Sequence, residues 1–242
     1  MAKLPPTASD REQAGSIESL YPFLYAGTTD VSAVLEQVRQ STVAKADEIL
    51  RLRQAVRDAD GSRLVACARE MAARFALGGR LLAVGNGGSA TDAQQVATLF
   101  LYPGGTARPL PALSLASDAS VLTALCNDIG VDVVFARQLA AFGTKSDIAI
   151  GMSTSGNSDN LLRAFDEASR RGMLTIGIAG YSGGQMAELD SIDYLFVAPS
   201  TSVHRIQEAQ TTVYNVLWEL CQSALAAGDQ GRPSQPDAVT AR

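Results

Sequence analysis

Five short apolar runs, separated by segments of helical length, are the feature that most constrains the fold of this chain. From residue 80 onward they read RLLAVG, ALSLAS, DIAIGMS, MLTIGIAG and YLFVAPS. Continuous runs rich in Val, Ile and Leu are typical of parallel strands whose sheet is covered by helices on both faces. The sequence therefore predicts a doubly wound α/β domain with a five-stranded parallel sheet. Ligands bind beyond the carboxyl ends of such strands, so chemistry is expected in the loops that begin at Gly85, Ser117, Ser153, Gly180 and Pro199.

The first of these loops is rich in glycine and leads directly into a helix. In LLAVGNGGSATDAQQVATLFL, residues 81–101, three glycines let the backbone turn tightly and approach a ligand. They are Gly85, Gly87 and Gly88, and Asn86 and Ser89 add polar side chains at the start of the helix. The loop is not GxGxxG, and no lysine follows its last glycine as in a Walker loop. It favours an anion other than a dinucleotide or a nucleoside triphosphate.

Hydroxyl side chains crowd the loop of GMSTSGNSDNLLRAF, residues 151–165. A predicted strand passes there straight into an amphipathic helix through Ser153, Thr154, Ser155, Asn157 and Ser158. Hydroxyls, backbone N–H groups and the positive end of a helix dipole together make a phosphate site that needs no cation. Ser and Asn are also preferred helix caps, which is the structural alternative. One cap uses one such residue and five are present, so the phosphate site is favoured.

Composition narrows the classes of partner. The chain has 20 lysines and arginines against 25 acidic residues, and it contains no run of basic residues that could lie along the phosphate backbone of a nucleic acid. Direct contact with nucleic acid is therefore not expected. The three cysteines stand at wide, irregular spacing, which favours reduced thiols over a disulfide framework or a metal knuckle. No apolar stretch approaches the roughly 20 residues of a membrane span, and no signal-peptide pattern opens the chain. We expect a soluble, unprocessed, cytoplasmic protein without a membrane partner.

The 242 residues suffice for one sizeable core between two polar ends. We expect an extension over residues 1–29, a domain over 30–227 and a disordered tail over 228–242. The extension contains SLYPFLYAG, residues 19–27, an aromatic segment that either docks a partner protein or covers the core of its own chain. Apolar spacings near three and four predict an amphipathic helix from about residue 30, followed by a shorter helix from about Gly61 to Leu77.

The two ligand loops resemble those of the sugar isomerase (SIS) domain family, in particular its phosphoheptose isomerase branch. The likeness extends over about residues 30–226 through GNGGSATDAQ, ALCNDIG, STSGNS, TIGIAGYSGGQMAEL and HRIQEAQ, in that order. It implies a flavodoxin-like sheet, a homotetramer held by the terminal helices, and a sugar phosphate, heptose or hexose, bound between subunits. Ser153, Thr154, Ser155 and Ser158 would hold the phosphate, and Asn86, Gly87, Gly88, Asn127, Asp128 and Gln207 would line the sugar, with Ser89 beside them.

The chain departs from that branch at the positions where the branch binds zinc. There the helix after GNGGS carries a histidine and, four residues later, a glutamate suited to proton transfer, and the last helix supplies the other ligands. Here Gln95, Leu99 and Asn215 occupy three of the four positions and only Gln207 is retained, while Gln210 replaces a further histidine. Amide and aliphatic side chains do not suit zinc, so neither a metal nor another cofactor is expected. An acid–base group contributes about 10²–10⁴-fold to such a reaction, so we expect sugar-phosphate binding with isomerisation reduced or lost.

Three residues are candidates for replacing the missing acid–base groups. His204, the single histidine, lies three residues before Gln207, Glu208 is adjacent to Gln207, and Asp128 lies in the CND segment. Each also has an ordinary interpretation, as a surface histidine or as a carboxylate at a turn or helix start.

The sequence therefore leaves three candidate functions. The favoured one is a sugar-phosphate-binding or regulatory protein, because the serine-rich phosphate loop is retained while three of the four zinc-ligand positions have changed. The chain is also similar to the DnaA initiator-associating proteins, which lack the same glutamate and last histidine and act as tetrameric scaffolds. The second is a phosphoheptose isomerase that uses His204, Asp128 or Glu208. The third is an interaction protein that works through the aromatic segment, residues 19–27.

Overall fold

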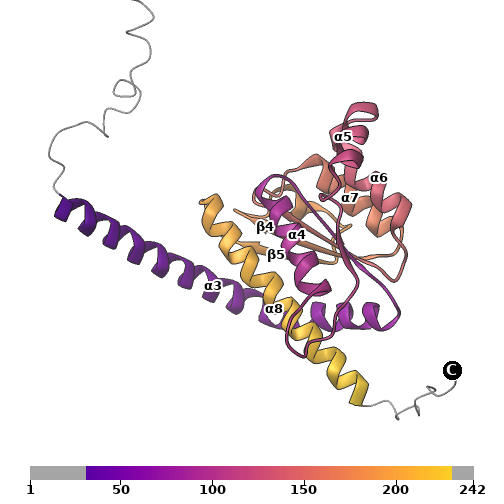
Figure 1. Ribbon diagram of the computed structural model, residues 1–242, viewed down its shortest axis with the longest axis horizontal. Helices are drawn as coiled ribbons and strands as arrows, with labels where there is room; N and C mark the ends of the chain where they lie inside the picture. Colours follow the sequence, from indigo (N-terminus) through magenta and orange to yellow (C-terminus); the bar gives the residue numbers. More distant parts are fainter. Residues whose placement is uncertain (1–30, 231–242) are drawn as a thin grey trace, which may run out of the picture. The chain divides into compact units, whose positions relative to one another are not determined.

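A computed structural model describes residues 31–230, which divide into two units between Asp47 and Glu48 (Figure 1). The first unit contributes residues 31–47, the amino-terminal part of helix α3 (Val31–Ala76). The second contains the rest of α3 and an α/β fold. Its further elements are β1 (Leu81–Gly85), α4 (Gly88–Leu101), β2 (Ala112–Ser114), α5 (Ala119–Asp128), η2 (Val131–Val133), α6 (Val134–Phe142), β3 (Ile148–Ser153), α7 (Asp159–Arg170), β4 (Leu174–Gly180), η3 (Gly184–Glu188), β5 (Tyr194–Ala198) and α8 (Val203–Gln230).

The terminal segments fall mostly outside these residues. The predicted extension, with its aromatic segment at residues 19–27, lies outside the described residues. Helix α8 continues to Gln230, three residues into the expected tail, and the rest of that tail also lies outside the described part.

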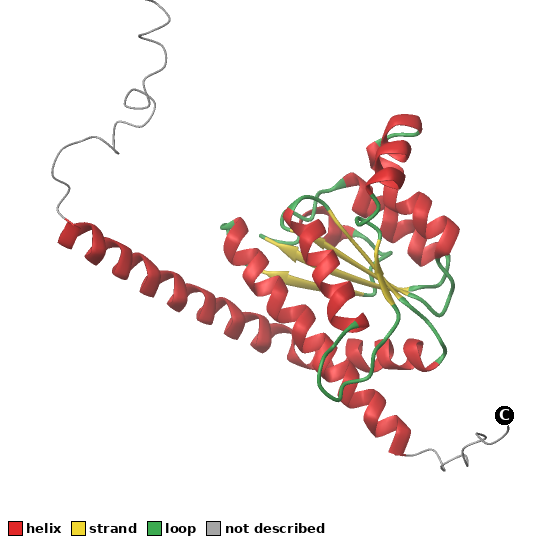
Figure 2. Ribbon diagram, in the orientation of Figure 1, coloured by secondary structure: helices red, strands yellow, loops and turns green. Residues whose placement is uncertain are grey.

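The five predicted strands form one parallel sheet in the order β2-β1-β3-β4-β5. Figure 2 shows the strands between the helices. This order is the flavodoxin-like one, so the predicted fold is confirmed. Every residue of β1, β3 and β4 is buried, as expected of strands covered on both faces.

Alternate residues of each strand face two separate layers of helices. Leu81 and Ala83 of β1 pack into a core with residues of α3, α4 and α8. Leu82 and Val84 pack on the opposite face with residues of α6 and α7. The period-two alternation of a strand thus divides one apolar run between two cores.

Helix α3 runs without a break through Gly61, so the predicted start of a separate helix near that residue is wrong. Glycine in a helix interior costs about 1 kcal/mol relative to alanine. Val56 and Leu64, on either side of Gly61, are each 6% exposed in the same core. Burying such a side chain gains about 1.5–3 kcal/mol, so packing outweighs the local preference.

The β5 edge of the sheet is covered by an arginine of α3. Arg63 Nη1 donates a hydrogen bond of 3.0 Å to the carbonyl oxygen of Leu195. Its guanidinium lies 5.6 Å from the centroid of the Phe196 ring.

Along the part of the chain that the structure describes, no helix has the length and apolar character required to span a membrane.

Candidate functional site

The glycine-rich and serine-rich loops begin side by side at the carboxyl edge of the sheet. Strands β1 and β3 are neighbours, and their register pairs Gly85 with Met152. The chain leaves β1 into α4 and leaves β3 into α7 within a few residues. The two loops singled out in the sequence are therefore adjacent because the two strands are paired.

Both helices that leave these loops begin without a side-chain cap. Gly87, the N-cap residue of α4, has a φ of 54° and no side chain to offer. Ser158, the N-cap residue of α7, makes no capping hydrogen bond. In α5, by contrast, Asp118 accepts hydrogen bonds from the backbone of Ser120 and Val121. Two helix ends that lack a side-chain cap and carry partial positive charge thus begin at one edge, which favours an anion there.

A pair of amides joins the two loops. Asn86 Nδ2 donates to Asn160 Oδ1 at 2.8 Å, and Asn160 Nδ2 donates back to Asn86 Oδ1 at 3.0 Å. Asn160 is buried in the first turn of α7, whereas Asn86 is exposed. The amide of Asn86 is thus already engaged with the neighbouring loop, and sequence reasoning did not identify Asn160.

The serine-rich loop is closed by its own hydroxyls. Ser153 Oγ accepts from the Gly156 amide at 3.0 Å and lies 3.3 Å from Ser158 Oγ. Ser155 Oγ accepts from the Asn157 amide at 3.3 Å. Ser153 is buried, while Thr154, Ser155 and Ser158 are partly exposed. The structure therefore gathers the four predicted phosphate-binding hydroxyls in one turn.

The segment after β4 holds this turn from the other side. Met186 N donates to Gly156 O at 3.0 Å, and Gln185 N donates to Asn157 Oδ1 at 2.8 Å. Gly156 has a φ of 70°, and a Cβ there would overlap the carbonyl of Gly183. Only glycine allows the two loops to approach this closely.

Helix α8 brings Gln207 to the glycine-rich loop. A Cβ on Gly88 would collide with Gln207 Nε2, and the same amide lies 3.4 Å from Asp92 Oδ2. Burial raises the pKa of the Asp92 carboxyl, and the hydrogen bond from Gln207 opposes this shift. Asp92 is 8% exposed and was not among the predicted site residues. Asp92 lies on the buried face of α4, and its partner Gln207 is 115 positions away in the sequence, so no local pattern marked the pair.

The remaining predicted residues have other neighbours. Asn127 and Asp128 are exposed at the carboxyl end of α5, where the amide of Asn127 donates to Asp128 at 2.8 Å. Glu208 forms an ion pair with Arg205 along α8. His204 is exposed in the first turn of α8. Within residues 31–230, no side-chain hydrogen bond or ion pair joins these groups to the two loops.

The positions where the resembled branch carries its zinc ligands hold amide and aliphatic side chains in this chain. Gln95 is exposed, and Leu99 packs against the core. Asn215 Nδ2 donates to Thr211 O at 2.8 Å, and the buried Gln210 donates to Ile178 O at 3.1 Å. Zinc takes thiolate, imidazole or carboxylate ligands, and these side chains supply none. No cluster of three or more His, Cys, Asp or Glu that could hold a metal occurs in the described range.

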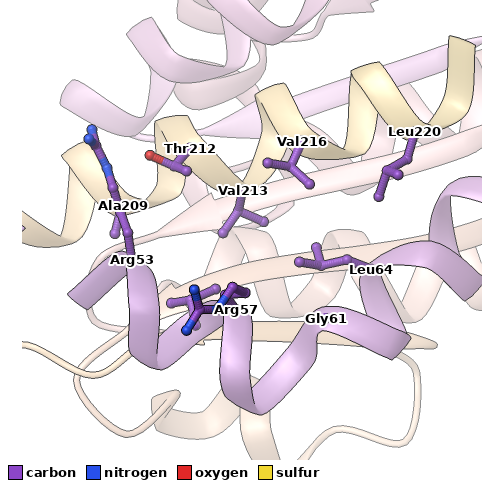
Figure 3. Close-up of a pocket in the computed structure, with 10 residues that line it drawn as sticks. Arg53, Arg57, Gly61, Leu64, Ala209, Thr212, Val213, Val216 and Leu220 are labelled. Atoms are coloured by element: carbon purple, nitrogen blue, oxygen red, sulfur yellow. The ribbon is translucent and has the colours of Figure 1, made fainter. Parts of the chain in front are cut away.

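An apolar pocket lies elsewhere, between α3 and α8 (Figure 3). Its volume is about 160 Å³. Leu64 of α3 faces Val213, Val216 and Leu220 of α8 across it. None of the predicted site residues lines it, and its walls are mainly apolar, with Arg53, Arg57 and Thr212 as the polar lining residues.

Comparison with known proteins agrees with this architecture. The family pattern described as SIS domain matches residues 46–180. The phosphoheptose isomerase of Pelodictyon phaeoclathratiforme is 41% identical over 202 residues, which are 82% of this chain and 93% of that protein. The solved structure of the phosphoheptose isomerase from Neisseria gonorrhoeae superposes with a TM-score of 0.69 at 34% identity and covers 77% of this chain and 99% of its own. The phosphoheptose isomerase structure from Francisella tularensis gives a TM-score of 0.69 at 27% identity, over 81% of this chain and 100% of its own.

Proposed function

Because the chain belongs to the SIS-domain family, we propose that it binds a phosphorylated sugar, a heptose or hexose phosphate, at the carboxyl edge of its sheet. The observation that carries the proposal is the pair of uncapped helix ends, those of α4 and α7, that follow two neighbouring strands. Neutral N–H dipoles and hydroxyls bind a phosphate well without a cationic side chain.

Each loop has its own part in this proposal. The hydroxyls of Ser153, Thr154, Ser155 and Ser158 bind the phosphate with the first N–H groups of α7. Gly87, Gly88, Ser89 and Gln207 line the sugar beside the α4 end. Asn86 helps to hold the two loops together, because its amide is hydrogen-bonded to the neighbouring loop. Asn127 and Asp128 lie at the end of α5 and would contact the sugar only from there.

Calorimetry with sedoheptulose 7-phosphate tests the proposal. Ser155→Ala removes one hydroxyl of the turn and should weaken binding about tenfold, the loss of one hydrogen bond to a charged group. Ser223→Ala is the matched control, since Ser223 is exposed near the far end of α8 and bonds only to Glu219 of its own helix. A wild-type chain that does not bind, or equal binding by the Ser155 variant, rejects the proposal.

We further propose that isomerisation is reduced or lost. The reaction moves a proton between adjacent carbons, and Leu99 has no group that transfers a proton. A coupled isomerisation assay together with metal analysis of the purified protein tests this. Turnover at the rate of the related isomerases, or one zinc ion per chain, contradicts it.

One observation favours active isomerisation as the alternative function. Asp92 is a buried carboxyl with a raised pKa beside Gln207, and a carboxylate with a raised pKa is a better general base near neutral pH. If the chain turns over, Asp92→Asn should abolish the activity. Substituting His204, Asp128 and Glu208 one at a time measures how much each of these residues, predicted from the sequence, contributes to the isomerase activity.

We also propose that the chain assembles as a homotetramer. In residues 31–47 the apolar side chains of Val34, Leu35, Val38 and Val43 are 42%, 63%, 56% and 50% exposed. Exposed apolar faces of this kind are typical of helices that pack on another subunit. Light scattering should give the tetramer mass for the wild type and a smaller mass for Leu35→Glu combined with Val38→Glu.

Two further predictions concern the setting and the partners of the chain. A reducing, cytoplasmic setting agrees with the free thiols of Cys67, Cys126 and Cys221.

Docking of a partner protein through residues 19–27 is tested by a pulldown with and without residues 1–29. An unchanged set of captured proteins contradicts it.

A further inference from the structure

Tyr181 has an unusual backbone conformation for its residue type. Its φ is 49°, and it is the one non-glycine residue with a positive φ in the described range. A bulky side chain in this region of backbone space is strained by contact with its own main chain. Such strain persists only where the surrounding structure enforces it, and it is concentrated at functional sites.

The strain arises in a tight turn. Gly183 N donates to Gly180 O at 2.8 Å, which makes Tyr181 and Ser182 the two central residues of the turn. Positive φ at the first central residue alone is the φ pattern of a type II′ turn, where glycine is the usual occupant. The sequence GYSGG has glycine at 180, 183 and 184 but a tyrosine at this position. The conformational preference of the turn therefore does not explain why a tyrosine occupies position 181.

This turn lies directly against the serine-rich loop. A Cβ on Gly180 would overlap the carbonyl oxygen of Thr154, so the two backbones are in contact at that point. A Cβ on Gly184 would likewise overlap the carbonyl oxygen of Ser155. Tyr181 is thus flanked on both sides by residues that touch the proposed phosphate-binding turn. Its side chain is 40% exposed, so the ring has surface available to a ligand.

We propose that Tyr181 is a sugar-contact residue, whose ring packs against the carbon chain of a sugar phosphate held by the serine-rich loop. The inference rests on the proposed function and adds a specificity determinant to it. An aromatic ring offers a broad apolar face, electron-rich at its centre, to the C–H groups of a sugar. It offers little to a bare phosphate. Tyr181 should therefore favour sugar phosphates over inorganic phosphate, whereas the serine hydroxyls bind both.

Calorimetry with sedoheptulose 7-phosphate and with inorganic phosphate separates these contributions. Tyr181→Gly should weaken sugar-phosphate binding about tenfold and leave phosphate binding unchanged, since it removes the ring but not the hydroxyls. Tyr181→Phe keeps the ring and should bind as the wild type does. Because glycine relieves the strain, the unfolding temperature of Tyr181→Gly should equal or exceed that of the wild type, so weaker binding is not a failure to fold. Tyr102→Gly, at an exposed tyrosine beyond the end of α4, is the control and should leave binding unchanged.

The outcomes distinguish this inference from the function on which it rests. Wild-type binding of the sugar phosphate with equal binding by Tyr181→Gly overturns the inference alone. A parallel loss of affinity for inorganic phosphate also overturns it, because the tyrosine would then only shape the phosphate-binding turn. An equal loss in Tyr181→Phe assigns the contact to the hydroxyl and overturns the ring contact. A wild-type chain that binds no sugar phosphate overturns the proposed function and, with it, the inference.

Discussion

Asn86 and Asn160 stand 74 positions apart in the sequence and exchange two hydrogen bonds through their side-chain amides. Each amide uses one donor and one acceptor, so the pair fixes both the distance between the loops and their relative orientation. The loops that begin α4 and α7 are thereby held as one unit before a ligand arrives. Preorganisation of this kind improves affinity because less conformational freedom is lost on binding.

Breaking this amide pair should uncouple the two loops. Asn160→Ala should lower the free energy of unfolding by about 2 kcal/mol, because it removes two hydrogen bonds that each contribute about 1 kcal/mol, and weaken sugar-phosphate binding. Asn86→Ala should have a similar effect, and the double variant should be little worse than either single one. A double-mutant cycle by urea unfolding and calorimetry measures this coupling. Strictly additive losses would show that the two amides act independently.

The Asp147 carboxylate makes stability depend on pH. Burial alone would raise the pKa of Asp147, but hydrogen bonds from Arg80 and Thr144 outweigh it and lower the pKa. A carboxyl with a lowered pKa in the folded state stabilises the protein above its unfolded pKa, near 3.9, and this contribution is lost as the pH falls through the folded value. Asp147→Asn should therefore lower the free energy of unfolding by about 2 kcal/mol at pH 7.

The difference between the wild type and Asp147→Asn should shrink as the pH falls below about 4, because the unfolded chain then binds a proton that the folded carboxyl takes up only at a lower pH. Urea unfolding across this pH range checks it. Asp58→Asn is the control, because the Asp58–Arg57 pair is largely exposed and should contribute little at any pH. A gap that stays constant down to pH 2 would contradict the assignment to Asp147.

Alanine at position 61 should stabilise helix α3. Gly61 lies inside the helix, and a Cβ there would have no heavy atom within 4 Å. Gly61→Ala should raise the free energy of unfolding by about 0.5–1 kcal/mol. Ala66→Gly, at an exposed position of the same helix, should lower it by a similar amount. A destabilised Gly61→Ala would contradict the open space found beside Gly61.

Introducing the zinc ligands of the resembled branch should create a zinc site. Gln95→His and Leu99→Glu on α4, combined with Asn215→His on α8, would join Gln207 in a set of imidazole, carboxylate and amide donors. We expect one zinc ion per chain by metal analysis and a gain of isomerisation in a coupled assay. The same triple variant with Gln94→His in place of Gln95→His turns the imidazole to another face of the helix and should bind no zinc. Equal metal content in both variants would refute this arrangement.

The sequence predicted the periodic features of the fold and missed its long-range contacts. All five strands were recognised because an apolar run buried on both faces carries its own signal. The break expected at Gly61 was wrong, since core contacts of Val56 and Leu64 outweigh a local preference. Asn160 and Asp92 were not identified, because their partners lie 74 and 115 positions away and no local pattern marks such a pairing.

The two edge strands of the sheet affect the tendency of the protein to aggregate at high concentration. β2 has only three residues, so an incoming strand would find few backbone groups to pair with. On the opposite edge strand, β5, Arg63 Nη1 already donates a hydrogen bond to the carbonyl oxygen of Leu195. Both features make the sheet edges poorer templates for cross-β growth, so fibril formation from the native state is disfavoured.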